Sequence, residues 1–515
     1  MSNGVSTNKK TLINVFCSLV LLCTNLVISF FLSPYIVKNI GVEANGFIQL
    51  ANNFVTYAQL IVTALNGMAA RYITLEYTKQ NYNKANLFYN SVFWGNIFIV
   101  LILFVPAVFM IFKLESLLNI PTELIFDVKV LFSIVFMNFF LGVAFPNWEC
   151  GTYVTNNLNR TYIPQAFLNI LKCGLIFILF ICFSPHVWFV GVAVSISTVL
   201  MLIVNCINTH ELTPQLYISI GKNKILYSFD AIKKLIGSGI WNSVANAGSI
   251  MLTGLNLLIC NTFLGAREMG IFSLSQIFYS VIFQLAHSLR SAFAPEMTIL
   301  YANGDRDKLL KVLNKDVKIA TILITVPLGG IIAFGDIFYK LWIPSQDSSL
   351  LYSLTILSLL NLFFTSGIQI LYNIFSIVDK VKDDAIQTVV SGIISISLNL
   401  LLLKFTNLGL YSIASVTAIV NIIRYLVITL PGLAKYLGYK PTQFYPHVGF
   451  TLLSISLITI IGVGIRNVFP INNWFAFVLI AFFTGIFGFI TNFLIFLRKE
   501  ERLILLQKFW NKFKK

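Results

Sequence analysis

Charged residues are scarce in this chain of 515 residues: Asp, Glu, Lys and Arg together make up 11%, whereas apolar residues make up 57%. The mean hydropathy is +0.82. Soluble domains contain about 25% charged residues, so these values exclude a soluble multidomain enzyme. Apolar runs of about twenty residues, the length that crosses a bilayer, recur along the whole sequence. They indicate an integral membrane protein.

Three further absences narrow the chemistry. The seven cysteines form no disulfide framework and no metal-ligand pairs, because six of them lie within apolar runs. A phosphate-binding loop is also missing, since Gly221-Lys222 follows Leu216 where the motif needs a glycine. The net charge of +16 does not indicate a nucleic-acid-binding protein, because such proteins concentrate Lys and Arg on a water-facing fold and the sequence predicts none. We therefore expect no metal, no cofactor, no nucleic-acid partner and no catalytic residue.

Apolar windows between polar breaks predict an all-α polytopic fold with fourteen membrane-spanning helices. They are placed at 12–34, 46–70, 88–112, 129–148, 164–184, 186–207, 238–263, 270–292, 317–338, 350–376, 385–405, 408–430, 446–466 and 473–497. With a cytoplasmic N-terminus, 26 of the 36 Lys and Arg residues fall in inside segments, seven fall in outside segments, and three fall within spans. Because cytoplasmic loops are enriched in Lys and Arg, we expect both termini in the cytoplasm.

The chain contains an internal repeat with an offset of 224 residues. Gly41 and Gly46 recur as Gly265 and Gly270, in the turn before an even-numbered span. Both copies start on the same side, so the repeat is parallel, as in two-lobed transporters. Ser228 is a helix-capping residue at the start of an amphipathic segment, which predicts an interfacial helix. The predicted parts are an N-lobe of helices 1–6 (1–215), a cytoplasmic amphipathic linker (216–237), a C-lobe of helices 7–12 (238–440), and helices 13 and 14 with a basic cytoplasmic tail (441–515).

Polar side chains follow one face of several predicted helices, at alternating steps of three and four residues. Each unpartnered polar group in hydrocarbon costs about 1–3 kcal/mol. Polar contacts between helices would explain a single stripe, but matching stripes in both halves favour a water-filled cavity. The predicted lining comprises Asn52, Thr56, Gln59, Thr63 and Asn66 of helix 2, Asn242, Asn246 and Asn256 of helix 7, and Gln276 and Ser280 of helix 8.

Three cations fall within predicted spans, and no carboxylate lies in the middle of one. Lys172 is near the middle of helix 5 and must face something polar. Arg290, which follows His287 on helix 8, and Arg424 lie nearer cytoplasmic ends, where snorkelling to the interface is the alternative. Cations without deep carboxylates favour an anionic ligand, so these four residues are candidate substrate ligands. Two residues are candidates for a gate or a proton site, with an ordinary interfacial position as the alternative: Arg71 and Glu149.

Four features carry a resemblance to a known family: the run PYIVKNIGVEANGF from Pro34, the basic turn with Arg71, the plan of six, six and two helices, and FDAIKK from Phe229. In these the chain resembles the bacterial Wzx-type oligosaccharide flippases of the multidrug/oligosaccharidyl-lipid/polysaccharide exporter superfamily. The resemblance implies alternating access between two lobes that moves undecaprenyl-pyrophosphate-linked oligosaccharide repeat units to the outer leaflet, for O-antigen, capsule or similar polymers. It also implies the bacterial cytoplasmic membrane as location, and membrane lipids, polysaccharide polymerase and chain-length proteins as partners.

Other functions remain open on the same scaffold. A multidrug antiporter is one. In that class, cation-coupled drug export resembles chemistry carried out by membrane carboxylates, and helix 1 has none from Leu12 to Ser33. A lipid II flippase is a nearer alternative, and no motif in the sequence separates it from an oligosaccharide flippase. A membrane polysaccharide polymerase or ligase is the alternative from another class. The longest predicted outside segment, 113–128, is short for such an enzyme.

Overall fold

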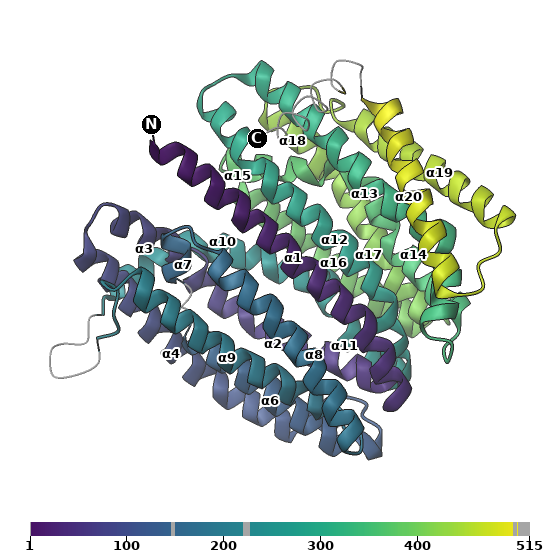
Figure 1. Ribbon diagram of the computed structural model, residues 1–515, viewed down its shortest axis with the longest axis horizontal. Helices are drawn as coiled ribbons and strands as arrows, with labels where there is room; N and C mark the ends of the chain where they lie inside the picture. Colours follow the sequence, from purple (N-terminus) through teal and green to yellow (C-terminus); the bar gives the residue numbers. More distant parts are fainter. Residues whose placement is uncertain (1, 146–149, 220–226, 498–501, 503–515) are drawn as a thin grey trace. The chain divides into compact units, whose positions relative to one another are not determined.

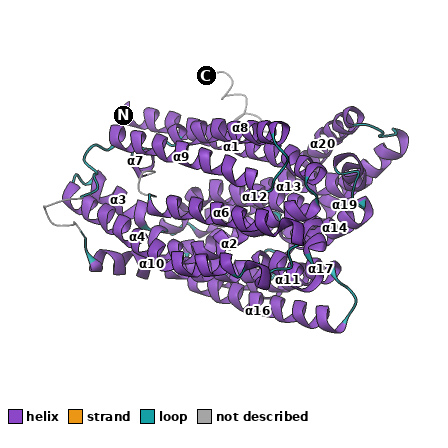
Figure 2. Ribbon diagram, turned by 90° about the horizontal axis from the view of Figure 1, so that it is seen from below, coloured by secondary structure: helices purple, strands orange, loops and turns teal. Residues whose placement is uncertain are grey.

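A computed structural model describes residues 2–145, 150–219, 227–497 and 502. Within these residues the regular secondary structure is helical throughout, and they contain no strand (Figure 2). Residue contacts divide the chain into two units, Met1–Gly270 and Ile271–Lys515. The fold is therefore that of an all-α polytopic protein, as the sequence predicts.

The first unit is a bundle in which α8 packs against α1 and α9, α9 packs against α6, and α10 packs against α2 (Figure 1). Its helices are α1 (Ser2–Asn39), α2 (Val42–Asn66), α3 (Ala69–Thr78), α4 (Tyr82–Phe112), α5 (Leu114–Leu117), η1 (Thr122–Leu124), α6 (Ile125–Ala144), α7 (Cys150–Val154), α8 (Asn159–Cys182), α9 (Trp188–Leu212), α10 (Phe229–Ser249), the π-helical turn η3 (Ile250–Gly254), α11 (Asn256–Leu264) and the start of α12 (Ala266–Ala302).

The second unit is built around α13, which packs against α14, α19 and α20. Its helices are the remainder of α12, then α13 (Arg306–Trp342), α14 (Ser348–Thr365), the 3-10 helix η4 (Gly367–Tyr372), α15 (Asn373–Ile377), α16 (Val381–Phe405), α17 (Leu410–Ile423), the π-helical turn η5 (Arg424–Thr429), α18 (Leu430–Tyr436), α19 (Tyr445–Val468) and α20 (Trp474–Phe496).

Every predicted span overlaps helical structure. Among the described residues, twelve helical segments between α4 and α20 are long and apolar enough to cross a membrane. The first two predicted spans correspond to α1 and α2. The pair of spans that meet near Pro185 is resolved by a break, because α8 ends at Cys182 and α9 begins at Trp188. The chain is a multi-pass membrane protein.

Some helices extend beyond the predicted spans. Both α12 and α13 have 37 residues, so the basic cluster that starts at Arg306 lies on a helix and not in a loop. Ser228 caps α10 through its side-chain oxygen, which accepts a hydrogen bond from the backbone amide of Ala231. The sequence separates an interfacial helix from a span beginning at 238, but the structure has one continuous helix. No proline interrupts it, and Gly239 allows close packing against the Ala64 carbonyl.

The backbone follows the 224-residue repeat. Gly41 and Gly265 stand at corresponding positions before α2 and α12, with φ values of 121° and 108° that favour glycine. Asn81 caps α4 and Asp305 caps α13, and each side chain accepts a hydrogen bond from the backbone amide three residues later. The two copies therefore share turn geometry and capping as well as residue identities. The predicted lobe boundaries follow this repeat, whereas the contact-based division assigns α10 and α11 to the first unit.

Candidate functional site

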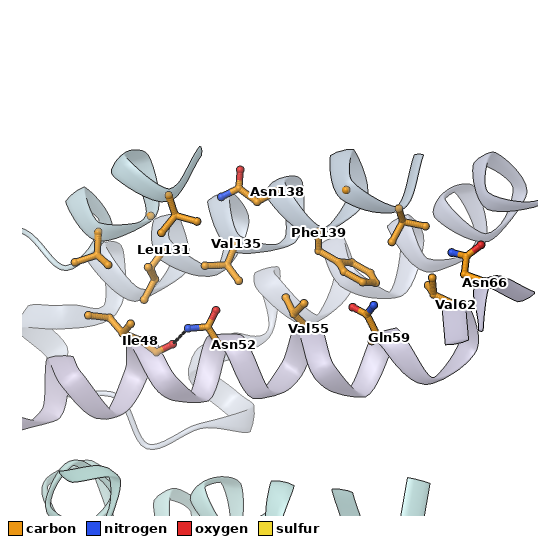
Figure 3. Close-up of a pocket in the computed structure, with 15 residues that line it drawn as sticks. Ile48, Asn52, Val55, Gln59, Val62, Asn66, Leu131, Val135, Asn138 and Phe139 are labelled. Carbon is orange, nitrogen blue, oxygen red and sulfur yellow. Dashed lines mark hydrogen bonds between the residues drawn. The ribbon is translucent and has the colours of Figure 1, made fainter. Parts of the chain in front are cut away.

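A cavity of about 480 Å³ lies within the first unit, between α2, α6 and α9 (Figure 3). Three amide side chains of α2 line it: Asn52, Gln59 and Asn66. They are seven residues apart, close to two helical turns, and therefore share one side of the helix. Part of the predicted polar stripe thus faces a cavity within one unit.

The three amides are engaged to different degrees. Asn52 donates a hydrogen bond to the Ile48 carbonyl at 2.9 Å, and Asn66 accepts one from Asn96 of α4 at 3.1 Å. No partner for the Gln59 amide is found among the described residues, and its side chain is exposed. Figure 3 shows the Gln59 amide opposite the ring of Phe139. Gln59 is therefore the α2 amide most available to a ligand.

The cavity is polar without being charged. Its lining among the described residues holds four amides, and no Lys, Arg, Asp, Glu or His. The remaining lining is apolar and comprises Ile48, Val55, Val62, Leu131, Val135, Phe139, Gly142, Val143, Val190, Gly191 and Val194. Amides both donate and accept hydrogen bonds, so this lining suits hydroxyl-bearing groups better than ions.

Helix α6 contributes six lining residues, none of which was predicted from the sequence, and Asn138 and Phe139 are among them. Both amide atoms of Asn138 are buried and have no hydrogen-bond partner in the described part of the chain. An amide side chain inside an apolar span has a high free-energy cost. The presence of asparagine in this span is therefore the sequence signal that could have identified Asn138. Phe139 carries no such signal, because it is one of 47 phenylalanines.

The other predicted lining residues of the first unit lie elsewhere. The hydroxyls of Thr56 and Thr63 donate to carbonyl oxygens one turn earlier in α2, and neither residue lines this cavity. Asn242 and Asn246 are exposed on α10, and Asn256 is buried in α11. Of these eight residues, Asn52, Gln59 and Asn66 line this cavity.

Lys172 is a half-buried residue of α8 and does not line the cavity. It lies about one helical turn after Asn169, which donates a hydrogen bond to Asn25 of α1 at 2.7 Å. No ion pair of Lys172 is found among the described residues. A polar seam between α1 and α8 thus runs close to this lysine, whose role as an anion ligand stays a prediction.

The polar residues of α12 belong to the second unit. Gln276 donates a hydrogen bond to Ser358 of α14 at 2.8 Å, and Ser280 donates one to its own helix backbone. Gln276 therefore also joins two helices, which is the alternative role expected for polar groups inside membranes.

Two arginines of the second unit stack on a pair of tyrosines. The Arg290 guanidinium lies 5.5 Å from the ring centroid of Tyr372, and that of Arg424 lies 4.8 Å from the centroid of Tyr425. The two rings are 5.1 Å apart. Cation–π contacts of this kind stabilise a guanidinium away from bulk water. The exposed side chain of His287 is one turn before Arg290.

Arg424 is only 6% exposed, so it does not snorkel to the interface. Its Nη atoms donate hydrogen bonds to Thr388 and Asn421, and it interacts electrostatically with Asp384 of α16. Arg424 is the first residue of the π-helical turn η5. Arg424 is therefore buried and bonded within the second unit, whereas Arg290 is partly exposed.

The remaining ionisable residues are scattered. Arg71 is exposed on α3, and Glu149 lies outside the described residues. Asp316, which precedes a predicted span by one residue, is in fact buried within α13. In the part of the chain that the structure covers, no group of three or more His, Cys, Asp or Glu side chains is placed to hold a metal ion.

Comparison of sequences identifies a similar curated protein. No protein-family model matches the chain. The membrane protein EpsK of Bacillus subtilis (strain 168), described as uncharacterized, is 26% identical over 504 residues, which cover 97% of this chain and 98% of that protein. The similarity therefore extends over essentially the full length of both proteins.

Comparison of structures gives the fold. The lipid II flippase MurJ, in an inward closed conformation, matches with a TM-score of 0.66 and 16% identity, over 93% of this chain and 98% of MurJ. An inward-facing multidrug resistance MATE family transporter of the MOP superfamily matches with a TM-score of 0.60 and 16% identity, over 80% and 94% of the two chains. The chain thus has the fold of these transporters.

Proposed function

We propose that this chain, which has the fold of MOP-superfamily transporters, is a flippase that moves undecaprenyl-pyrophosphate-linked oligosaccharide repeat units from the cytoplasmic to the outer leaflet. The amide-lined cavity between α2, α6 and α9 carries the proposal. A lipid-linked oligosaccharide presents many hydroxyls, and side-chain amides supply both donors and acceptors for them.

The second unit supplies the complementary chemistry. Arg290 is a partly exposed guanidinium held over Tyr372, next to the exposed His287. Guanidinium groups form strong bidentate hydrogen bonds with phosphate oxygens, so Arg290 is the proposed pyrophosphate ligand. Arg424 acts through the tyrosine pair to hold that arrangement. Lys172 remains a further proposed anion ligand in the first unit.

The location and cycle follow from the same proposal. The bias of basic residues toward inside segments supports cytoplasmic termini, and the head group would enter from the cytoplasmic leaflet of a bacterial cytoplasmic membrane. Alternating access would then expose it outside. The family resemblance implies a polysaccharide polymerase and chain-length proteins as partners. They would join the exported repeat units into O-antigen, capsule or a similar polymer.

Two transport alternatives remain on the same fold. The TM-score of 0.66 to the lipid II flippase MurJ favours a lipid-linked cargo of that type as well. The likeness to a MATE transporter and the buried Asp316 favour a cation-coupled multidrug antiporter. The described lining of the first-unit cavity has no carboxylate to attract a cationic drug, which favours an oligosaccharide instead.

A deletion strain tests the proposed function. Loss of the flippase should cause lipid-linked repeat units to accumulate in the inner leaflet and should stop polymer export. Plasmid-borne wild-type protein should restore export, whereas Arg290→Gln should reduce it by about tenfold, as expected when a charged ligand loses its partner. The matched control is Arg267→Gln, an exposed arginine in the first turn of the same helix, which should restore export fully.

The outcomes separate the alternatives. Normal polymer export by the deletion strain together with drug hypersensitivity would favour the antiporter, and depletion of peptidoglycan precursors outside would favour lipid II. Equal export by Arg290→Gln and Arg267→Gln, with equal amounts of protein in the membrane, would remove Arg290 from the site.

A further inference from the structure

The cavity between α2, α6 and α9 differs from the rest of the predicted site in its charge. Its lining in the described residues is uncharged, whereas the arginine–tyrosine group lies wholly in the second unit. A carboxylate that entered the cavity would lose its hydration without gaining a cationic partner, which is strongly unfavourable. An uncharged polar ligand avoids that penalty.

The polar groups of the cavity are arranged for hydroxyls. The Gln59 amide has no hydrogen-bond partner among the described residues, and both amide atoms of Asn138 are buried and unpaired. Buried polar groups in native proteins are nearly always paired. The exposed Gln59 amide is the group that a ligand in the cavity can reach, and the hydroxyls and acetamido group of a sugar can donate to it and accept from it.

An apolar surface accompanies the amides. Phe139 is 7% exposed, and its ring lies opposite the Gln59 amide across the cavity (Figure 3). A pyranose ring has one face made mainly of C–H groups, which packs on an aromatic ring while its hydroxyls bond at the edge. Clefts of a few hundred Å³ with mostly apolar walls and a few placed polar groups are typical of small-ligand sites.

We propose that this cavity is a subsite for an uncharged sugar ring of the lipid-linked cargo, with Gln59 as its specificity-determining residue and Phe139 as its apolar platform. The inference rests on the proposed function and adds to it the class of sugar. Neutral hexoses and N-acetylhexosamines fit the subsite, and uronic acids do not.

Binding to the full-length protein in lipid nanodiscs tests this subsite. Ligand-observed NMR would compare a β-1,4-linked N-acetylglucosamine disaccharide with an α-1,4-linked galacturonic acid disaccharide. The neutral disaccharide should bind about tenfold more tightly, because the site offers hydrogen bonds but no cation. Gln59→Leu and Phe139→Leu should each weaken its binding by about fivefold to tenfold. The matched control Gln284→Leu, an exposed glutamine of α12, should not change it.

An added positive charge makes the test sharper. Gln59→Lys introduces a cation into the cavity and should raise the affinity for the galacturonic acid disaccharide about tenfold while lowering that for the neutral one. Because Gln59 is exposed, its variants should fold even if Phe139→Leu does not. Equal binding of the two disaccharides by the wild type, or unchanged binding in all three variants, would overturn the proposal.

Undecaprenyl pyrophosphate is the second probe, and it distinguishes a failure of the subsite from a failure of the proposed function. If it binds to the wild type while the neutral disaccharide does not, the subsite is wrong and the flippase stands. If neither probe binds, the proposed function fails as well. Binding of both, with only the disaccharide affected by the Gln59 variants, supports the subsite.

Discussion

At positions related by the repeat, the two halves carry different side chains. Thr63 corresponds to His287 and Asn66 to Arg290 in the 224-residue offset. The first half thus keeps neutral groups where the second half has ionisable ones. This difference matches the proposed division of labour, in which the first half binds hydroxyls and the second half binds the anion.

Arg424 provides a prediction at the residue scale. Arg424→Leu should destabilise the protein by about 3–5 kcal/mol, because it leaves Asp384 and two buried hydrogen-bonding groups without their partner. Arg424→Lys should recover only part of this loss, since an ammonium cannot reproduce the planar contacts. Thermal unfolding in detergent measures both. The control Arg267→Lys, at an exposed position, should unfold at the same temperature as the wild type.

A wild-type unfolding temperature for Arg424→Leu would show that the arginine is not structural. In that case its hydrogen bonds to Thr388 and Asn421 would contribute little to stability, and a role in binding the substrate would be favoured instead.

At the scale of elements, close helix contacts depend on glycines that repeat with the same offset. Gly46 lies against Gly270 where α2 and α12 begin, and a Cβ on Gly46 would be 3.0 Å from the Gly270 Cα. Asparagines also connect parts of the first unit. The side chains of Asn86 and Asn90 of α4 each form hydrogen bonds with backbone groups of the segment that follows α9, including the Tyr217 amide and carbonyl. These contacts give hydrogen-bond partners to backbone groups of a segment without regular secondary structure.

The glycine contact gives a prediction. Gly270→Ala should destabilise the first unit by about 1–3 kcal/mol, because its methyl group would press on the Val42 backbone. Gly174→Ala is the control: an added Cβ meets nothing within 4 Å on α8, so it should be neutral or slightly stabilising. Denaturant or thermal unfolding of the two variants checks the difference. Equal stabilities would show that the helices separate at little cost.

At the scale of the whole molecule, the distribution of basic residues predicts the orientation. In a variant without its seven cysteines, Glu123→Cys should react with a membrane-impermeant maleimide added to intact cells, because the segment 113–128 is predicted to lie outside. Asn303→Cys, after α12, should react only once the cells are opened. Both positions are exposed, so accessibility depends on the side of the membrane. The reverse pattern would invert the predicted topology.

The sequence by itself determined the helices, because hydropathy and helical periodicity are local properties that a bilayer enforces. It also determined the repeat, the capping residue Ser228, and the stripe that contains Asn52, Gln59 and Asn66. It placed helix boundaries less well where helices continue into water, as at the start of α13.

Only the tertiary structure decided which residues of a stripe meet a cavity and what faces them. Gln59 lies opposite Phe139 because α2 packs beside α6, and Arg424 is buried with its guanidinium bonded to Thr388 of α16. A stripe fixes the face of one helix, but its neighbour is chosen by packing among segments far apart in the sequence. That choice depends on side-chain shape and helix irregularities that no local pattern encodes.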